Sequence, residues 1–144
     1  MKKVLVLNGP NINILGVREP TLYGNATISN IEQQLKALAK ELNLEIELFQ
    51  SNHEGKIIDK IQNSLNDTSG IIINPAAFTH TSIAIRDALS CLEVPIIEVH
   101  ISNIYKREEF RHKSYIAPIT AGQIIGFGID GYLFALKKIK SLIE

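Results

Sequence analysis

Near the start of the chain an apolar run, Val4-Leu5-Val6-Leu7, changes abruptly into the polar segment Asn8-Gly9-Pro10-Asn11. Consecutive apolar residues bounded by turn residues are typical of a strand buried on both faces. In an open α/β sheet, ligands bind in the loop after the carboxyl end of such a strand. The loop here also carries Arg18 and Tyr23. We therefore expect residues 8–24 to form part of a ligand site.

The composition is that of one ordinary globular domain. The chain has 144 residues, 45% hydrophobic and 21% charged, enough to bury a core without cross-links. Its 15 basic and 15 acidic residues give a net charge of +0, so no electrostatic basis exists for binding nucleic acid or an anionic membrane. The one cysteine, Cys91, lies in an apolar helical run that predicts a buried thiol. The apolar run at 4–7 is too short for a signal peptide or a membrane span, so we expect a cytoplasmic protein.

Apolar runs alternate with stretches in which apolar residues recur at steps of three and four. The second pattern predicts helices at 28–42, 57–65, 82–92 and 129–143, with a short charged helical turn at 106–111. Ser29 and Glu32 have the spacing of a capping box, which predicts the start of the first helix. The predicted strands are 4–7, 45–50, 71–73, 94–99 and 123–127.

Strands that alternate with helices predict a parallel sheet with helices on both faces, a three-layer α/β sandwich. For five strands the expected order is 2-1-3-4-5, with the β-branched run at 71–73 as a central strand. The sequence contains no linker or repeat, so we expect residues 1–144 to form a single catalytic domain.

Polar side chains gather where the predicted strands end. The carboxyl ends of strands one, three and four meet at one edge of such a sheet, which predicts a pocket of amides, hydroxyls and imidazoles. Such a pocket suits a hydroxylated, anionic small molecule, with its carboxylate held by Arg111 or by the backbone N–H groups of Ile101 and Ser102. The residues concerned are Asn8, Asn11, Arg18, Tyr23, Asn74, Thr79, His80, Ser82, His100, Ser102 and Arg111.

Two of these residues are candidates for moving protons. Tyr23 is a base if the guanidinium of Arg18 favours its ionised form. His100 is an acid if it is held protonated, and Glu98, two residues earlier, points to the same face of the strand and favours that form. Each residue taken singly is also compatible with an ordinary surface or hydrogen-bonding role.

Other known sites fit poorly. Residues 126–131 match G-x-G-x-x-G, but the remaining chain leaves no room for the second strand of a dinucleotide-binding unit, so we expect a tightly packed helix start instead. A phosphate-accepting receiver domain needs acidic residues where this chain has Asn8 and Asn74. The histidines lack metal-ligand spacing, so no metal is expected.

Several stretches, taken together, are specific to one family. They are Asn8-Gly9-Pro10-Asn11 with Arg18-Glu19-Pro20 and Tyr23-Gly24; Phe49-Gln50-Ser51-Asn52-His53-Glu54-Gly55; Asn74-Pro75-Ala76-Ala77 with Thr79-His80-Thr81-Ser82; Ile85-Arg86-Asp87-Ala88; Glu98-Val99-His100-Ile101-Ser102-Asn103; and Arg107-Glu108 through Arg111-His112. On these residues the chain resembles the type II 3-dehydroquinate dehydratases over essentially its whole length. Ile12 and Ile14 replace leucines that are common in the family.

The resemblance implies a flavodoxin-like fold without flavin and a lyase that needs neither cofactor nor metal. The implied reaction is an anti elimination of water from 3-dehydroquinate, through an enolate, to give 3-dehydroshikimate in the shikimate pathway. The pathway role is aromatic amino acid and chorismate biosynthesis, although the residues leave a role in quinate breakdown open. By the same resemblance Tyr23 is the proton acceptor, Arg18 stabilises the transition state, and Asn11 holds a water at the enolate. His100, supported by Glu98, is the proton donor.

The resemblance also implies substrate-binding residues and an assembly. Binding is assigned to Asn74, His80 and Arg111 for hydroxyl groups, to Ile101 and Ser102 for the carboxylate, and to Asp87, which is expected to reach a neighbouring subunit's site. The family forms dodecamers built from trimers, so a homododecamer is expected. Two alternatives remain: a non-catalytic flavodoxin-like module that binds flavin or a nucleotide, and a different lyase or isomerase using the same tyrosine and histidine.

Overall fold

The apolar runs form one parallel sheet in the computed structural model, which describes residues 1–16 and 27–144. Its five strands lie in the order β2-β1-β3-β4-β5, which confirms the predicted order. The strands are β1 (Lys3–Asn8), β2 (Glu45–Gln50), β3 (Gly70–Asn74), β4 (Ile96–His100) and β5 (Gly122–Ile125). β3 is buried along its whole length between β1 and β4, as expected for a central strand.

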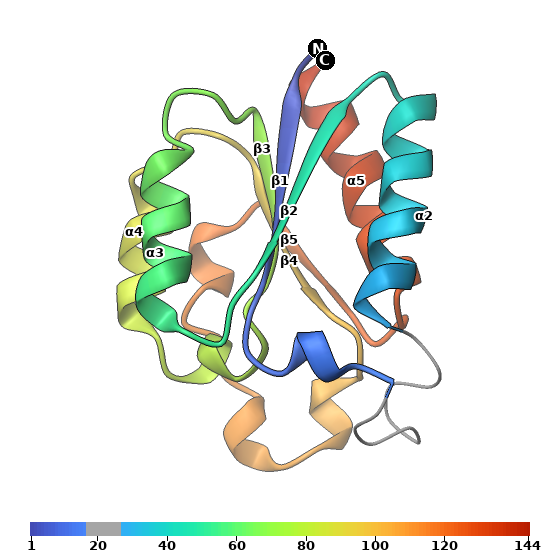
Figure 1. Ribbon diagram of the computed structural model, residues 1–144. Helices are drawn as coiled ribbons and strands as arrows, with labels where there is room; N and C mark the ends of the chain where they lie inside the picture. Colours follow the sequence, from blue (N-terminus) through green and yellow to red (C-terminus); the bar gives the residue numbers. More distant parts are fainter. Residues whose placement is uncertain (17–26) are drawn as a thin grey trace.

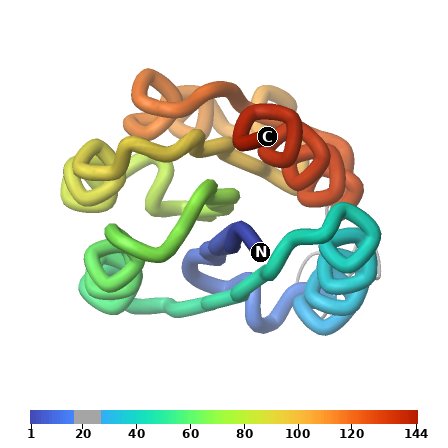
Figure 2. The backbone as a smooth tube through the Cα atoms, turned by 90° about the horizontal axis from the view of Figure 1, so that it is seen from above, coloured from blue at the N-terminus to red at the C-terminus, as the bar shows by residue number. Residues whose placement is uncertain are grey.

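Helices cover both faces of the sheet and make it the middle of three layers (Figure 1). α2 (Ile28–Glu41) and α5 (Asp130–Ile143) pack on one face, and α3 (Glu54–Asn63) and α4 (Ile83–Ser90) pack on the other. Figure 2 shows the same layers from above, in a view that runs roughly along the strands. Both termini lie at one end of the strands, and the carboxyl ends of the strands lie at the opposite end of the sheet (Figure 1).

Successive residues of β1 contribute to different cores, because side chains alternate across a strand. Val4 and Val6 join the cluster under α2 and α5, whereas Leu5 and Leu7 join the cluster under α3 and α4. All four are 0% exposed. Fully burying one such side chain stabilises the fold by roughly 1.5–3 kcal/mol. An uninterrupted apolar run is therefore what a strand between two helical layers requires.

Two local predictions were wrong. The capping box of α2 is formed by Thr27 and Asn30, not by Ser29 and Glu32: Thr27 Oγ1 accepts from Asn30 N at 3.1 Å, and Asn30 Oδ1 accepts from Thr27 N at 3.2 Å. The helix already includes Ile28, and an N-cap residue needs a non-helical backbone such as the extended one of Thr27.

Cys91 was predicted to be buried, but it is exposed. It forms the C-cap of α4, one residue beyond the helix. The predicted helical turn at 106–111 consists of two short 3-10 helices, η3 (Ile104–Lys106) and η4 (Glu109–Arg111).

The glycine motif at 126–131 begins α5, as predicted. A Cβ atom on Gly131 would lie 3.3 Å from Val99 Cγ1 and 3.4 Å from Ile124 Cγ2. Gly131 therefore lets the first turn of α5 approach β4 and β5 closely, and a Cβ atom there would require the Val99 and Ile124 side chains to shift by a few tenths of an ångström. Gly126 has a φ of 91°, in the region that favours glycine.

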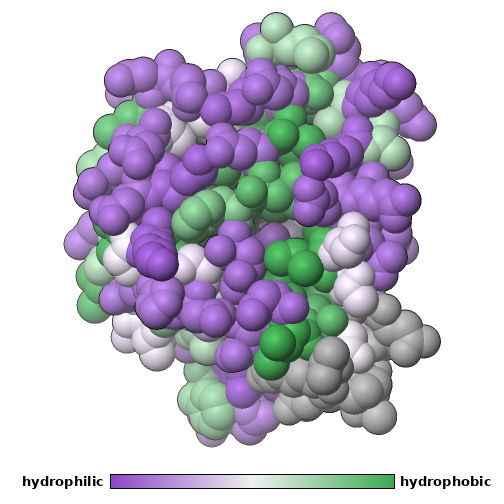
Figure 3. All heavy atoms as spheres, in the orientation of Figure 1, coloured by the Kyte–Doolittle hydropathy of each residue, from purple (hydrophilic) through white to green (hydrophobic). Residues whose placement is uncertain are grey.

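Hydrophilic side chains cover most of the face seen in Figure 3, and hydrophobic ones appear mainly as a narrow band along its middle. The edge strand β2 crosses this face and is only partly buried (Figure 1). Within residues 1–16 and 27–144, no helix has the length and apolar character needed to cross a membrane.

Candidate active site

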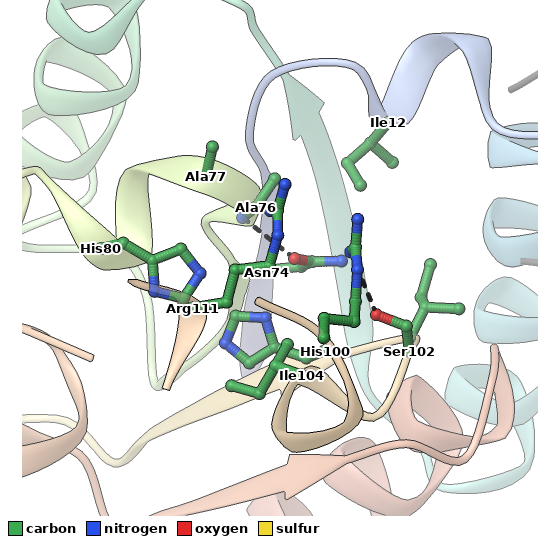
Figure 4. A pocket seen from close by; sticks show the side chains of 11 residues that line it. Ile12, Asn74, Ala76, Ala77, His80, His100, Ser102, Ile104 and Arg111 are labelled. Atoms are coloured by element: carbon green, nitrogen blue, oxygen red, sulfur yellow. Dashed lines mark hydrogen bonds between the residues drawn. The ribbon is translucent and has the colours of Figure 1, made fainter. Parts of the chain in front are cut away.

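A pocket opens at the carboxyl edge of the sheet, between the ends of β3 and β4 and the 3-10 segments that follow them (Figure 4). It brings together most of the residues that the sequence proposed for substrate binding, with the proposed proton donor beside them. The lining residues are Ile12, Asn74, Ala76, Ala77, His80, His100, Ile101, Ser102, Ile104, Arg107 and Arg111.

Among the described candidates, Asn11, Asp87 and Glu98 are not lining residues of this pocket. Asn11 follows β1 in a left-handed conformation (φ 71°), and its N–H donates to Asn52 Oδ1 at 3.0 Å. Asp87 lies exposed on α4, outside this pocket. Arg18 and Tyr23 lie outside the described residues.

The remaining candidate, Glu98, is buried beneath the pocket. Its side chain is 0% exposed, and its Oε2 contacts Nε2 of His100, which is 5% exposed. Both residues belong to β4 and point to the same face, as predicted. A carboxylate only accepts hydrogen bonds, so Nε2 carries the proton in this pair and Nδ1 is the ring nitrogen left for other partners.

Two hydroxyl groups complete the surroundings of the Glu98 carboxylate. Thr79 Oγ1 donates to Oε2 at 3.0 Å, and Ser114 Oγ lies 2.8 Å from Oε1 and 3.0 Å from Oε2. Burial by itself would raise the pKa of Glu98, but the hydrogen bond and charge of His100, with the hydroxyls of Ser114 and Thr79, hold this pKa below its usual value. The carboxylate therefore stays ionised in a buried position.

His80 has a different environment from His100, although the two rings stack with centroids 6.4 Å apart. His80 Nδ1 lies 2.8 Å from the carbonyl oxygen of Lys113, so Nδ1 carries the proton and Nε2 is an acceptor in the neutral ring. Burial lowers the pKa of His80, and the nearby charges of His100 and Arg111 add to the effect. His80 is thus suited to accept a hydrogen bond from a ligand hydroxyl.

Two guanidinium groups give the pocket its positive charge. Arg111 Nε donates to Glu108 Oε2 at 2.7 Å, and Arg107 Nη1 lies 3.4 Å from Ser102 Oγ. Both arginines line the same pocket as Asn74 and His100, and Figure 4 shows the Arg111 side chain near these two residues. In a chain with no net charge, this local pair can attract an anion.

The loop after β3 is held in a strained conformation. Ala76 has a φ of 53°, unusual for a residue with a Cβ atom, and its N–H donates to Asn74 Oδ1 at 3.1 Å. Gly9 lies against this loop so closely that a Cβ atom would be 2.2 Å from the carbonyl oxygen of Pro75. The close contact between Gly9 and Pro75 therefore fixes the end of β1 in position relative to the end of β3.

Several residues of the site were missed by the sequence reasoning. Ser114 comes from a loop 16 residues after Glu98, and no local pattern relates the two residues. Thr79 was noted among the residues after the third strand, without a role. Arg107 was quoted only as part of a matching stretch, and Tyr132 only as an apolar position of the last helix.

The chain is similar to known proteins in both sequence and structure. The family model described as dehydroquinase class II matches residues 2–140. The 3-dehydroquinate dehydratase of Endomicrobium trichonymphae is 72% identical over 143 residues, which cover 99% of this chain and 100% of that protein. The crystal structure of type II dehydroquinase from Butyrivibrio crossotus DSM 2876 superposes with a TM-score of 0.94 at 51% identity, covering 96% of this chain and 97% of that one.

A second crystal structure, of type II dehydroquinase from Propionibacterium acnes, also gives a TM-score of 0.94, at 44% identity over 98% of this chain and 97% of that one. Both the sequence and the structural similarities extend over nearly the whole chain. The chain therefore belongs to the class II dehydroquinase family.

Proposed function

We propose that this chain is a type II 3-dehydroquinate dehydratase, a hydro-lyase of the shikimate pathway. It removes water from 3-dehydroquinate by anti elimination through an enolate and releases 3-dehydroshikimate. The observation that carries the proposal is the buried Glu98–His100 pair, which opens onto a pocket with two guanidinium groups in a member of this family. Residues 1–144 act as one catalytic domain.

The first step is removal of a proton from C2, next to the ketone. We assign it to the phenolate of Tyr23, with Arg18 favouring the ionised phenol and stabilising the developing negative charge. The electron pair of the C–H bond moves to the ketone oxygen and forms the enolate. Asn11 holds a water that donates to this oxygen.

The second step breaks the bond between C1 and its hydroxyl oxygen. The enolate collapses to a conjugated enone, and the leaving hydroxyl takes a proton from His100, so that water is the second product. Glu98 accepts a hydrogen bond from Nε2–H of His100, which leaves Nδ1 as the donor to the substrate. The buried carboxylate also balances the positive charge of the protonated ring.

Binding is shared among the polar groups of the pocket. Asn74, His80 and Arg111 bind hydroxyl groups of the substrate, and the backbone N–H groups of Ile101 and Ser102 bind its carboxylate. The neutral His80 acts as an acceptor through Nε2, and the positive charge of Arg111 attracts the anionic substrate.

The decisive experiment is a spectrophotometric assay of the wild-type protein with 3-dehydroquinate in the presence of EDTA. The product is a conjugated enone and absorbs in the ultraviolet, where the substrate barely does. Tyr23→Phe is measured in parallel, with Tyr105→Phe as the control, because Tyr105 is an exposed phenol that does not line the pocket.

We expect absorbance to rise with the wild type and with Tyr105→Phe, and not with Tyr23→Phe. This result would support the reaction, its independence of metal and the identity of the base. A flat trace from folded wild-type protein would exclude the dehydratase and favour a non-catalytic binding module. Near-normal turnover by Tyr23→Phe would exclude Tyr23 as the base and leave the reaction in place.

We further propose a cytoplasmic homododecamer of four trimers, in which Asp87 reaches the site of a neighbouring subunit. Asp87 is exposed on α4, as this contact requires, and the single cysteine suits a reducing compartment. Size-exclusion chromatography with light scattering should give about twelve times the chain mass of 16.0 kDa. A monomeric mass with full activity would contradict the role of Asp87.

A further inference from the structure

Tyr132 lies in the first turn of α5, yet its hydroxyl reaches the end of the sheet where the pocket opens. The residue is 0% exposed. Its hydroxyl accepts a hydrogen bond from Asn74 Nδ2 at 2.9 Å and donates one to Asn8 Oδ1 at 2.6 Å. Asn8 and Asn74 are register partners at the ends of β1 and β3. The phenol thus links the two strands from beneath the pocket.

The hydrogen bonds around Asn74 give its side-chain amide one orientation. The N–H of Ala76 can only donate, so the atom 3.1 Å away must be the amide oxygen of Asn74. The amide nitrogen then faces Tyr132, whose oxygen accepts. Because the phenol has one proton, that proton goes to Asn8 Oδ1, and Asn8 Nδ2 has no hydrogen-bond partner among the described residues. The chain of donors runs in one direction, from Asn74 through Tyr132 to Asn8.

This chain of hydrogen bonds determines what Asn74 offers to the pocket that it lines. One N–H and one oxygen lone pair of the amide are already used, so one N–H and one lone pair remain. If the amide turned over, the positions of donor and acceptor would exchange, and a substrate hydroxyl would meet the wrong group. We propose that Tyr132 is a positioning residue whose hydroxyl, together with the N–H of Ala76, holds the amide of Asn74 in place for substrate binding; this inference rests on the proposed function of the site.

Packing explains how a core residue reaches the site. Gly131 brings the start of α5 onto β4 and β5, and the ring of Tyr132 fills the core between α5 and the sheet. A phenylalanine would fill nearly the same volume, and the only described hydrogen-bond partners of the hydroxyl are the two asparagines. Burial raises the pKa of the Tyr132 phenol, so the group keeps its proton. The direction of the hydrogen bonds from Asn74 through Tyr132 to Asn8 therefore does not change with pH.

The test measures KM and kcat for 3-dehydroquinate in a double-mutant cycle of Tyr132→Phe and Asn74→Ala. Tyr132→Phe should raise KM about three- to tenfold, the effect of one lost hydrogen bond, and change kcat less than about twofold. In the Asn74→Ala background the same substitution should leave KM unchanged, because the amide that Tyr132 orients is absent. Ile139→Val, a buried change on α5 far from the pocket, serves as the control for lost core stability.

The outcomes are distinct. An unchanged KM in Tyr132→Phe, an equal rise in both backgrounds, or an equal rise in Ile139→Val would overturn the positioning role. Should Tyr132→Phe fail to fold, Asn8→Ala provides a second test, because it removes the group that accepts the Tyr132 hydroxyl proton. The inference requires this variant to raise KM as well. Absence of turnover by the wild-type protein would instead overturn the proposed function, together with this inference.

Discussion

The hydroxyl of Ser114 donates to the carboxylate of Glu98, with Oγ 2.8 Å from Oε1 and 3.0 Å from Oε2. Ser114 Oγ in turn accepts hydrogen bonds from the N–H groups of Ile116 and Ala117, at 3.2 and 3.0 Å. These two donors occupy the lone pairs of the hydroxyl oxygen, so its one proton is directed at Glu98. A loop residue outside the sheet therefore helps to hold a buried charge in place.

Ser114→Ala should lower kcat/KM about three- to tenfold, because Glu98 loses a donor that favours its ionised form. The pKa of Glu98 should rise towards its usual value, since one of the groups that lower it is gone. A protonated Glu98 no longer supports His100, so the acidic limb of the profile should move to higher pH. The profile of kcat/KM against pH tests this, with Ser141→Ala, an exposed serine on α5, as control. An unshifted acidic limb would contradict the role of Ser114.

Glu98→Gln should change how stability depends on pH. The pKa of Glu98 in the folded protein is lowered from 4.5, so the ionised group stabilises the fold above about pH 4.5 and loses this contribution as the pH falls through the lowered pKa. At pH 7 we expect the variant to be roughly 1–3 kcal/mol less stable, because buried donors lose a charged acceptor.

Urea unfolding of both proteins at a fixed concentration, at pH 7 and pH 4, measures the difference. It should shrink at pH 4, because the wild type has begun to lose the contribution that the variant lacks. Glu41→Gln, at an exposed position, should show no such dependence. A difference that grows in acid would contradict the lowered pKa.

Gly9→Ala should destabilise the protein by about 1–3 kcal/mol, because the new Cβ atom would lie 2.2 Å from the carbonyl oxygen of Pro75, a backbone atom that side-chain rotation cannot move aside. The clash also displaces the loop that holds Asn74, so KM should rise. Gly55→Ala is the matched control: nothing lies within 4 Å of its Cβ atom, and the position is helical. There we expect stabilisation by about 0.5–1 kcal/mol. Unfolding in urea compares the two, and equal effects would exclude the steric argument.

The sequence predicted what periodicity and burial determine. The run Val4–Leu7 read correctly as a strand with two buried faces, and the register that follows places Asn8 beside Asn74. His80 follows β3 and His100 ends β4. The two residues lie close together because the carboxyl ends of neighbouring parallel strands lie at the same end of the sheet. Topology alone thus accounts for the place of the site.

What the sequence did not predict depends on contacts between distant segments. Ser114 contacts Glu98 from a loop, and no apolar pattern in the sequence predicts the path of that loop. In the sequence, Tyr132 is only one of several apolar positions of α5; its hydrogen bonds to Asn8 and Asn74 become evident only in the structure. The start of α2 was misplaced because two pairs with capping spacing overlap, and only the extended backbone of Thr27 decides between them.

His80 gives a further prediction, because its tautomer and charge are both determined by its neighbours. Burial and the charges of His100 and Arg111 lower its pKa from 6.5, so the neutral ring predominates from pH 6.5 to 8 and Nε2 accepts from the substrate. KM should therefore be constant over this range and rise only below pH 6.5, where protonation turns the acceptor into a donor. His80→Ala should raise KM about three- to tenfold at pH 7.5 and remove the rise in acid, because the titrating group is gone. KM measured from pH 5 to 8 for both proteins tests this; an inflection above pH 6.5 in the wild type, or the same acid rise in His80→Ala, would show that His80 does not act as a neutral acceptor.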